Sequence, residues 1–188
     1  MSNLLVQNIK HTNGTTAATI SSGGVFTSAG HIIQVKYFQL TTNQTETISS
    51  ANADQAISNF TVNITPTSTS SIIKLEAQVF LESSNSPHDT VFFFFRDSTK
   101  LANTETVGSR RAGIVVPSIS FHNETSSTAE MAHLGYFDAP SSTSAIAYKL
   151  GVNTNATNDL FINRTKDDTD NGSHERGVSW ISAMEIAQ

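Results

Sequence analysis

Acidic side chains are the first place to look for chemistry in this sequence, because two carboxylates can cleave a glycosidic bond. Such cleavage needs two carboxyl groups about 5–9.5 Å apart in the fold. The chain holds 16 Asp and Glu residues, and Glu82 with Asp89 is one candidate pair. With so many acids a chance pair is common. We therefore predict no catalytic residue and no enzyme, with a glycan-degrading enzyme as an alternative hypothesis.

The six histidines are the next candidates, as metal ligands. None shows the H-E-x-x-H or H-x-x-x-H spacing that sets two ligands on one turn of a helix. We interpret His31, His88 and His122 as surface residues near strand ends. The chain has no cysteine, and no G-x-S-x-G, Walker or dinucleotide-binding glycine pattern occurs. The sequence therefore predicts neither a metal ligand nor a cofactor.

One acidic run resembles a calcium-binding loop. Asp167, Asp168 and Asp170 precede Gly172, but Val178 stands where the bidentate glutamate of such a loop should be. We predict a polar hairpin loop at this position, and ion binding by the Asp167–Asp170 loop is the alternative.

Charge and hydropathy argue against two classes of partner. The formal net charge is -5 and Lys and Arg do not cluster, so the chain lacks the basic patch that binds a phosphate backbone. No apolar run approaches the roughly 20 residues that a helix needs to cross a bilayer, and the opening residues lack a signal-peptide pattern. We expect a soluble protein that binds no nucleic acid, inserts in no membrane and is not exported by a signal peptide.

Composition indicates the elements that must position these side chains. Ser, Thr and Asn make up about a third of the chain, whereas charged residues make up 14%. Thr favours a pleated surface, and Ser and Asn favour turns. Apolar segments separated by turn-forming residues predict nine strands, at 31–40, 60–65, 72–82, 90–97, 113–122, 132–139, 144–152, 159–164 and 178–186.

Two of these strands have informative faces. In 72–82 apolar and polar residues alternate, which is typical of a strand with one face in a core and one in water. In 91–95 (VFFFF) both faces are apolar, so both need cover. A loop of the same chain is one possible cover and another subunit is the other. We favour the subunit, and predict an oligomer interface that contains Phe92, Phe94 and Arg96.

Four segments carry a resemblance to a known family: LLVQNIKHTNGTTAATISSGG, VFFFFRDSTKL, YFDAPSSTSAIAYKLGV and INRTKDDTDNGSHERGVSWISAMEIAQ. Together they resemble tail-fibre and virion structural proteins of bacteriophages, particularly those common in marine viruses. The resemblance implies a short stem, a jelly-roll-like domain whose last strand ends in a pattern like Met184-Glu185-Ile186, and a virion component that is usually trimeric. Many tail fibres have a longer shaft than this chain, so a head fibre, a capsid decoration protein and a short tail tip stay open.

The sequence thus predicts an all-β protein with two parts. Residues 1–30, with short apolar clusters around Ile9, Ile20 and Val25–Phe26, form an extended attachment arm, and residues 31–188 form a jelly-roll-like β-sandwich. We expect a homotrimer in the virion, assembled in the host cytoplasm, with the arm on other virion proteins. The loops 83–90, 98–112 and 165–177 are candidates for contact with a host surface glycan or receptor.

Overall fold

The computed structural model describes residues 6–20, 24, 26–84, 89–105, 108–117 and 126–188, and in these residues every regular element is a β-strand. The all-β prediction is confirmed. In chain order the strands are β1 (Asn8–Lys10), β2 (Thr16–Ile20), β3 (Phe26–Thr27), β4 (Ile32–Leu40), β5 (Gln44–Ile48), β6 (Gln55–Ile64), β7 (Ile72–Ser83), β8 (Val91–Arg96), β9 (Thr99–Leu101), β10 (Glu130–Asp138), β11 (Ile146–Asn153), β12 (Asn158–Ile162) and β13 (Ser179–Ile186).

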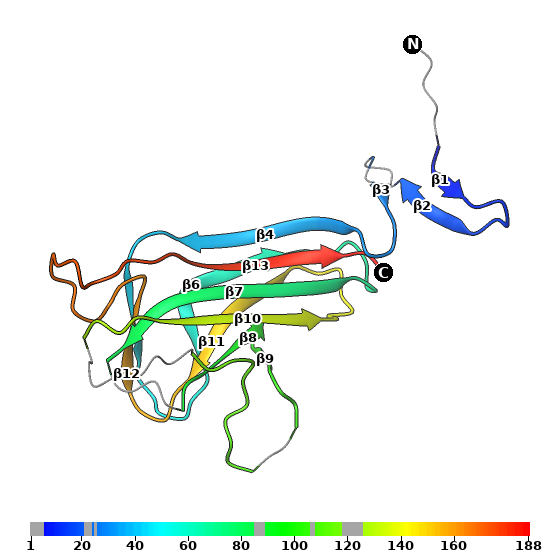
Figure 1. Ribbon diagram of the computed structural model, residues 1–188. Coiled ribbons are helices and arrows are strands. Elements are labelled where there is room, and N and C mark those ends of the chain that lie inside the picture. Colours follow the sequence, from blue (N-terminus) through cyan, green and yellow to red (C-terminus); the bar gives the residue numbers. More distant parts are fainter. Residues whose placement is uncertain (1–5, 21–23, 25, 85–88, 106–107, 118–125) are drawn as a thin grey trace.

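Two antiparallel sheets form the sandwich (Figure 1). The first places β4, β13, β7 and β10 side by side, and β12 and β5 continue it beyond the end of β13 along β7. The second has the order β6-β11-β8-β9. Without the short β5 and β12, the strands from β4 onward number eight, and the first sheet takes the first, eighth, third and sixth of them. The second sheet takes the second, seventh, fourth and fifth, which is the strand order of a jelly roll.

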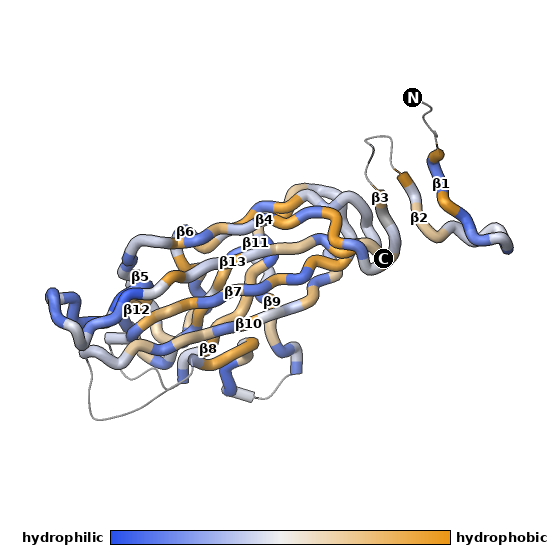
Figure 2. Tube along the Cα trace, turned by 45° about the horizontal axis from the view of Figure 1, so that its top comes forward, coloured by the Kyte–Doolittle hydropathy of each residue, from blue (hydrophilic) through white to orange (hydrophobic). Residues whose placement is uncertain are grey.

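Alternating side chains explain why the sheets pack face to face. Along β7 the side chains of Ile73, Leu75 and Leu81 are completely buried, whereas Lys74 and Gln78 between them point to the other face. Figure 2 shows this alternation as changes between polar and apolar colour along the strand. The inward residues of β7 meet those of the second sheet, including Phe60 and Tyr148, in one hydrophobic core.

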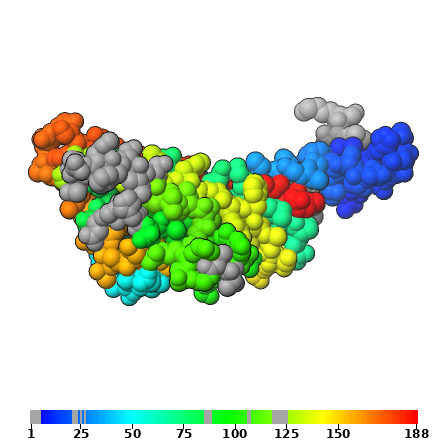
Figure 3. Space-filling view, turned by 60° about the horizontal axis from the view of Figure 1, so that its bottom comes forward, coloured from blue at the N-terminus to red at the C-terminus, as the bar shows by residue number. Residues whose placement is uncertain are grey.

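The N-terminal segment lies apart from the sandwich. Strands β1, β2 and β3 form a small antiparallel sheet of their own, so the apolar clusters around Ile9, Ile20 and Phe26 do fall on short strands. This arm projects from the end of the sandwich where the C-terminus lies (Figures 1 and 3). Its base is held by the backbone bonds from Gly30 N to Ala187 O, 2.8 Å, and from Ala187 N to His31 O, 2.9 Å.

One predicted strand is wrong in its described part. Residues 113–117 run as a loop in which Val115 forms a single bridge with Phe92, and residues 118–122 lie outside the described part of the chain. Each of the other predicted strands overlaps a strand of the structure. Residues 113–117 do not form a strand because they cross over the apolar strand β8. Their apolar side chains cover that strand instead of joining a sheet.

Candidate functional site

The outer face of the first sheet carries an unusual number of apolar side chains. Paired strands place register partners on the same face, so one row across the sheet consists of Val35, Met184, Lys74 and Phe137. The parallel row through Tyr37 crosses Ser182, Glu76 and Gly135, and the row through Trp180 crosses Gln39, Gln78 and His133. We call the set Val35, Tyr37, Met131, Phe137, Trp180 and Met184 the aromatic face.

Several side chains of the aromatic face are open to solvent. Tyr37 is 74% exposed, Phe137 65% and Val35 49%. Trp180 is half-buried, and the ring of His133 meets it edge-on with the centroids 6.1 Å apart. Large exposed apolar side chains that gather on one face of a sheet are a feature of association surfaces.

Charge on the aromatic face is neutralised within the chain. Lys74 Nζ lies 2.9 Å from Glu76 Oε1, and both residues stand on β7 in the middle of the face. Aromatic residues and methionine are enriched, and unpaired charges depleted, in protein interfaces. In its aromatic and methionine content the aromatic face resembles a protein interface.

Sequence reasoning missed the aromatic face, although a signal was present. The segment of β4 has Tyr37 beside Phe38, and that of β10 has Tyr136 beside Phe137. Adjacent aromatic residues in a strand point to opposite faces. Each pair therefore puts one ring towards the core and one on the outer face of the sheet.

The prediction of an oligomer interface at Phe92 and Phe94 is wrong. Both rings are completely buried in the core between the two sheets of one chain. Phe93, which points to the other face of β8, is completely buried as well, and it packs with Ala102, Ala112 and Ile114 of the same chain. The cover for the second face is therefore an intrachain loop, the other alternative of the sequence analysis.

Arg96, the third predicted interface residue, makes an internal contact. Its Nη1 lies 3.0 Å from Oδ1 of Asp138, and the hydroxyl of Tyr148 donates to Oδ2 of the same carboxylate at 2.6 Å. Burial and the bond to Asp138 raise the pKa of Tyr148. Because Arg96 and Tyr148 belong to the second sheet and Asp138 to the first, this group ties the two sheets together.

The two carboxylates of the candidate pair, Glu82 and Asp89, bind different partners in the structure. Glu82 is buried and accepts a hydrogen bond from the Lys166 N–H at 2.7 Å, whereas Asp89 is exposed and accepts one from Asn155 at 3.0 Å. The acidic neighbour of Glu82 is instead Glu130. Burial, and then the charge of Glu82, raise the pKa of Glu130 to about 7.

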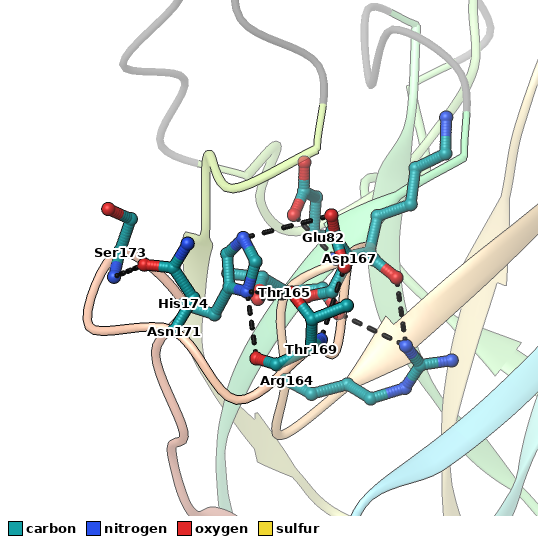
Figure 4. A network of polar contacts seen from close by, with 9 residues as sticks. Glu82, Arg164, Thr165, Asp167, Thr169, Asn171, Ser173 and His174 are labelled. Atoms are coloured by element: carbon teal, nitrogen blue, oxygen red, sulfur yellow. Dashed lines mark hydrogen bonds and ion pairs between the residues drawn. The ribbon is translucent and has the colours of Figure 1, made fainter.

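The loop from Asp167 to His174 is held by its own polar contacts (Figure 4). The Thr169 N–H donates to Asp167 Oδ1 at 3.1 Å, and the other oxygen of Asp167 lies 3.9 Å from His174 Nε2. Asp168 forms an ion pair with Arg176. Across the described residues, no three His, Cys, Asp or Glu side chains are grouped so as to hold a metal ion.

The predicted histidine positions divide between two outcomes. His31 is exposed directly before β4, with Phe26 edge-on at 6.2 Å, whereas His88 and His122 lie outside the described residues.

In the part of the chain that the structure describes, no helix is long and apolar enough to span a membrane. No protein-family model matches the sequence, and no curated protein matches it either.

Proposed function

We propose that this protein is a structural subunit of a bacteriophage particle, a component of a tail fibre, head fibre or spike that assembles as a homo-oligomer. The observation that carries the proposal is the aromatic face. Full burial of a large apolar side chain contributes about 1.5–3 kcal/mol. In a single chain Tyr37 and Phe137 leave most of their surface exposed, and Val35 leaves half of it exposed.

A second copy of the chain is the partner that fits this face best. The Lys74–Glu76 pair leaves no net charge in its centre, so two such faces meet without repulsion. Strand β4, which carries Val35 and Tyr37, follows directly from the arm. Association through this face therefore brings the arms of neighbouring subunits together.

The arm supports the same proposal. Ile9 is 47% exposed, Phe26 46% and Val6 40%, although β1–β3 form a sheet too small for a core of its own. Apolar residues on such a sheet gain burial when other chains pack on it. In the proposed role the arm orders against neighbouring arms and attaches the subunit to other virion proteins.

In this proposal the arm that attaches the subunit and the loop that contacts the host lie at opposite ends of the molecule. The loop 165–177 lies at the end of the sandwich away from the arm (Figures 1 and 3), and its Lys166 reaches Ser84 O, 3.5 Å, at the end of β7. We propose this end for contact with a host surface glycan or receptor. Loops on a rigid scaffold are where such contacts usually lie.

The carboxyl groups favour an architectural role over a glycan-degrading one. Glu82 is 4% exposed and Glu130 8%, so the acidic neighbours are closed to a polysaccharide.

The proposed trimeric state and the proposed location in the virion rest on the resemblance of the sequence to phage structural proteins.

Imaging of labelled particles tests the proposal. Gold-labelled antibodies against the purified chain should bind the phage that encodes it at a fixed position on tail or head fibres. A uniform coat of label on the capsid would instead indicate a decoration protein. Purified particles that carry no label and no copy of the chain would contradict the proposal altogether.

A further inference from the structure

The first sheet of the sandwich has two long open edges. Strand β4 forms one edge and pairs with β13, whereas β10 forms the other and pairs with β7. Figure 1 shows β4 and β10 as the outermost strands of this sheet. Among the described residues, no backbone hydrogen bond joins either strand to a segment on its outer side. Each strand therefore offers a row of N–H and C=O groups to which a further strand can pair.

The other edges of the sandwich carry features that discourage pairing. Strands β9 and β5 have only three and five residues. Strand β6 is long, but its register with β11 shifts between Lys149 and Gly151, and Asn59 has a positive φ of 68° in the shifted part. Short strands and bulges are the usual means of blocking an edge. By contrast, β4 and β10 have nine residues each, contain no proline, and pair regularly from Gln34 to the end of β4 and along all of β10.

The most exposed side chains of the aromatic face stand on these two edges. On β4, Val35 is 49% exposed and Tyr37 74%, and on β10 Met131 is 39% exposed and Phe137 65%. Trp180, on β13 between the edges, is half-buried. Contact between β4 of one copy and β10 of the next brings the two exposed sets together. Aromatic and β-branched side chains that meet across paired strands stabilise a sheet.

Strand direction permits this contact between copies. Strands β4 and β7 run one way and β13 and β10 the other, because each pair of neighbours is antiparallel. A copy that is rotated about an axis along the strands keeps these directions, so its β10 meets β4 in antiparallel orientation. Such a contact is head to tail, and repeated rotation closes it into a ring. All the arms then project from one end, since β4 begins where the arm ends.

Charge favours β10 over a second β4 as the partner of β4. The one charged residue of β4 is Lys36, which is exposed in the middle of the strand. Two β4 strands paired about their middle would bring the two Lys36 side chains together, and like charges opposite each other destabilise a strand pair. Strand β10 contains no Lys or Arg, and its two acids, Glu130 and Asp138, stand at its ends. Pairing of β4 with β10 therefore avoids the repulsion.

We propose that the oligomer is built by strand pairing, with β4 of each copy hydrogen-bonded in antiparallel orientation to β10 of the next copy. This inference rests on the proposed function, because it names the contact through which the proposed subunits assemble. The first sheets of the copies then continue one another around the ring. Their aromatic faces join into one surface that is turned toward the axis and is buried there.

Cysteine cross-linking tests the pairing, because the chain has no cysteine of its own. Rotation without a shift along the strands continues the row of Gln39, Trp180, Gln78 and His133 into the next copy, and so sets Gln39 opposite His133. Within one chain these two residues are three strand spacings apart, roughly 14 Å, which is too far for a disulfide. Gln39→Cys with His133→Cys should therefore form disulfides between copies. After oxidation, most of the protein should run as covalent trimer on a denaturing gel without reductant.

Two further variants cover the neighbouring registers, and a third is the control. Gln39→Cys combined with Met131→Cys or with Gly135→Cys tests a shift of two residues in either direction, which keeps the same side chains on the outer face. Gly135 tolerates the change, because an added Cβ meets Leu75 O at 3.6 Å as its nearest contact. Gln39→Cys with Gln78→Cys, on β7 in the middle of the sheet, is the matched control and should run as a single chain.

The outcomes separate this inference from the proposed function. A covalent trimer from one of the three edge variants, and none from the control, supports the strand pairing. If sedimentation shows an oligomer but no edge variant cross-links, or if the control cross-links equally, the strand pairing is wrong while assembly through the aromatic face still stands. A single-chain mass would overturn both the strand pairing and the proposed oligomer.

Discussion

At the scale of single residues, the buried carboxylate of Glu185 connects the last strand, β13, to other segments of the fold. Its carboxylate is completely buried and accepts bonds from Gln34, from Ser71 and from both the N–H and the hydroxyl of Thr67. It therefore fastens the segment before β7 to the last strand. Burial alone would raise the pKa of this carboxyl, but the hydrogen bonds outweigh burial and lower it.

Glu185→Gln should remove part of the stability, and the loss should be larger at neutral than at acid pH. The folded pKa lies below the unfolded one, so the carboxylate stabilises the fold above the ordinary value of 4.5, and this contribution is lost as the pH falls below it. At pH 7 we expect the free energy of unfolding to drop by about 2 kcal/mol. Denaturant titrations at pH 7 and at acid pH measure both effects, and equal losses at the two pH values would contradict this role.

At the scale of elements, the loop over β8 replaces the second subunit that the sequence predicted. Phe92 N donates to Val115 O and Ile114 N to Phe92 O, each at 2.8 Å, so the loop is fixed to the strand that it covers. Gly113 lies at the closest approach, where an added Cβ would stand 2.5 Å from the Cβ of Val91.

Gly113→Ala should therefore lift the loop from β8. We expect the free energy of unfolding to fall by about 1–3 kcal/mol through overpacking, and a dye that binds apolar surfaces should bind more strongly as Phe93 is uncovered. Gly172→Ala is the control, because a Cβ there meets nothing within 4 Å. Equal stability of the two variants, measured by chemical unfolding, would show that the contact does not matter.

The elements also show how far the sequence could lead. Alternation predicted β7 and its buried face, and the turn-forming residues predicted most strand positions, because each is a local property of the chain. VFFFF correctly indicated a strand with two covered faces, but which segment covers the outer one is a long-range contact. For the same reason the sequence did not indicate that the charge of Glu82 acts on the pKa of Glu130, which stands on a strand far along the chain.

At the scale of the whole molecule, the aromatic face and the arm give one picture. The sandwich has a complete core of its own, yet Tyr37 and Phe137 on its outside, and Ile9 and Phe26 on the arm, stay open to solvent. Both sets of side chains are buried at once if several copies pack around the first sheet with their arms side by side. Assembly is thus the central claim of this account.

The mass of the native protein in solution tests that claim most directly. Sedimentation equilibrium at micromolar concentration should give about three times the chain mass of 20.2 kDa. The double variant Tyr37→Asp and Phe137→Asp should give a folded single chain, whereas Asn63→Asp, at an exposed site on the second sheet, should leave the trimer intact. A wild-type mass of 20.2 kDa under these conditions would contradict the account.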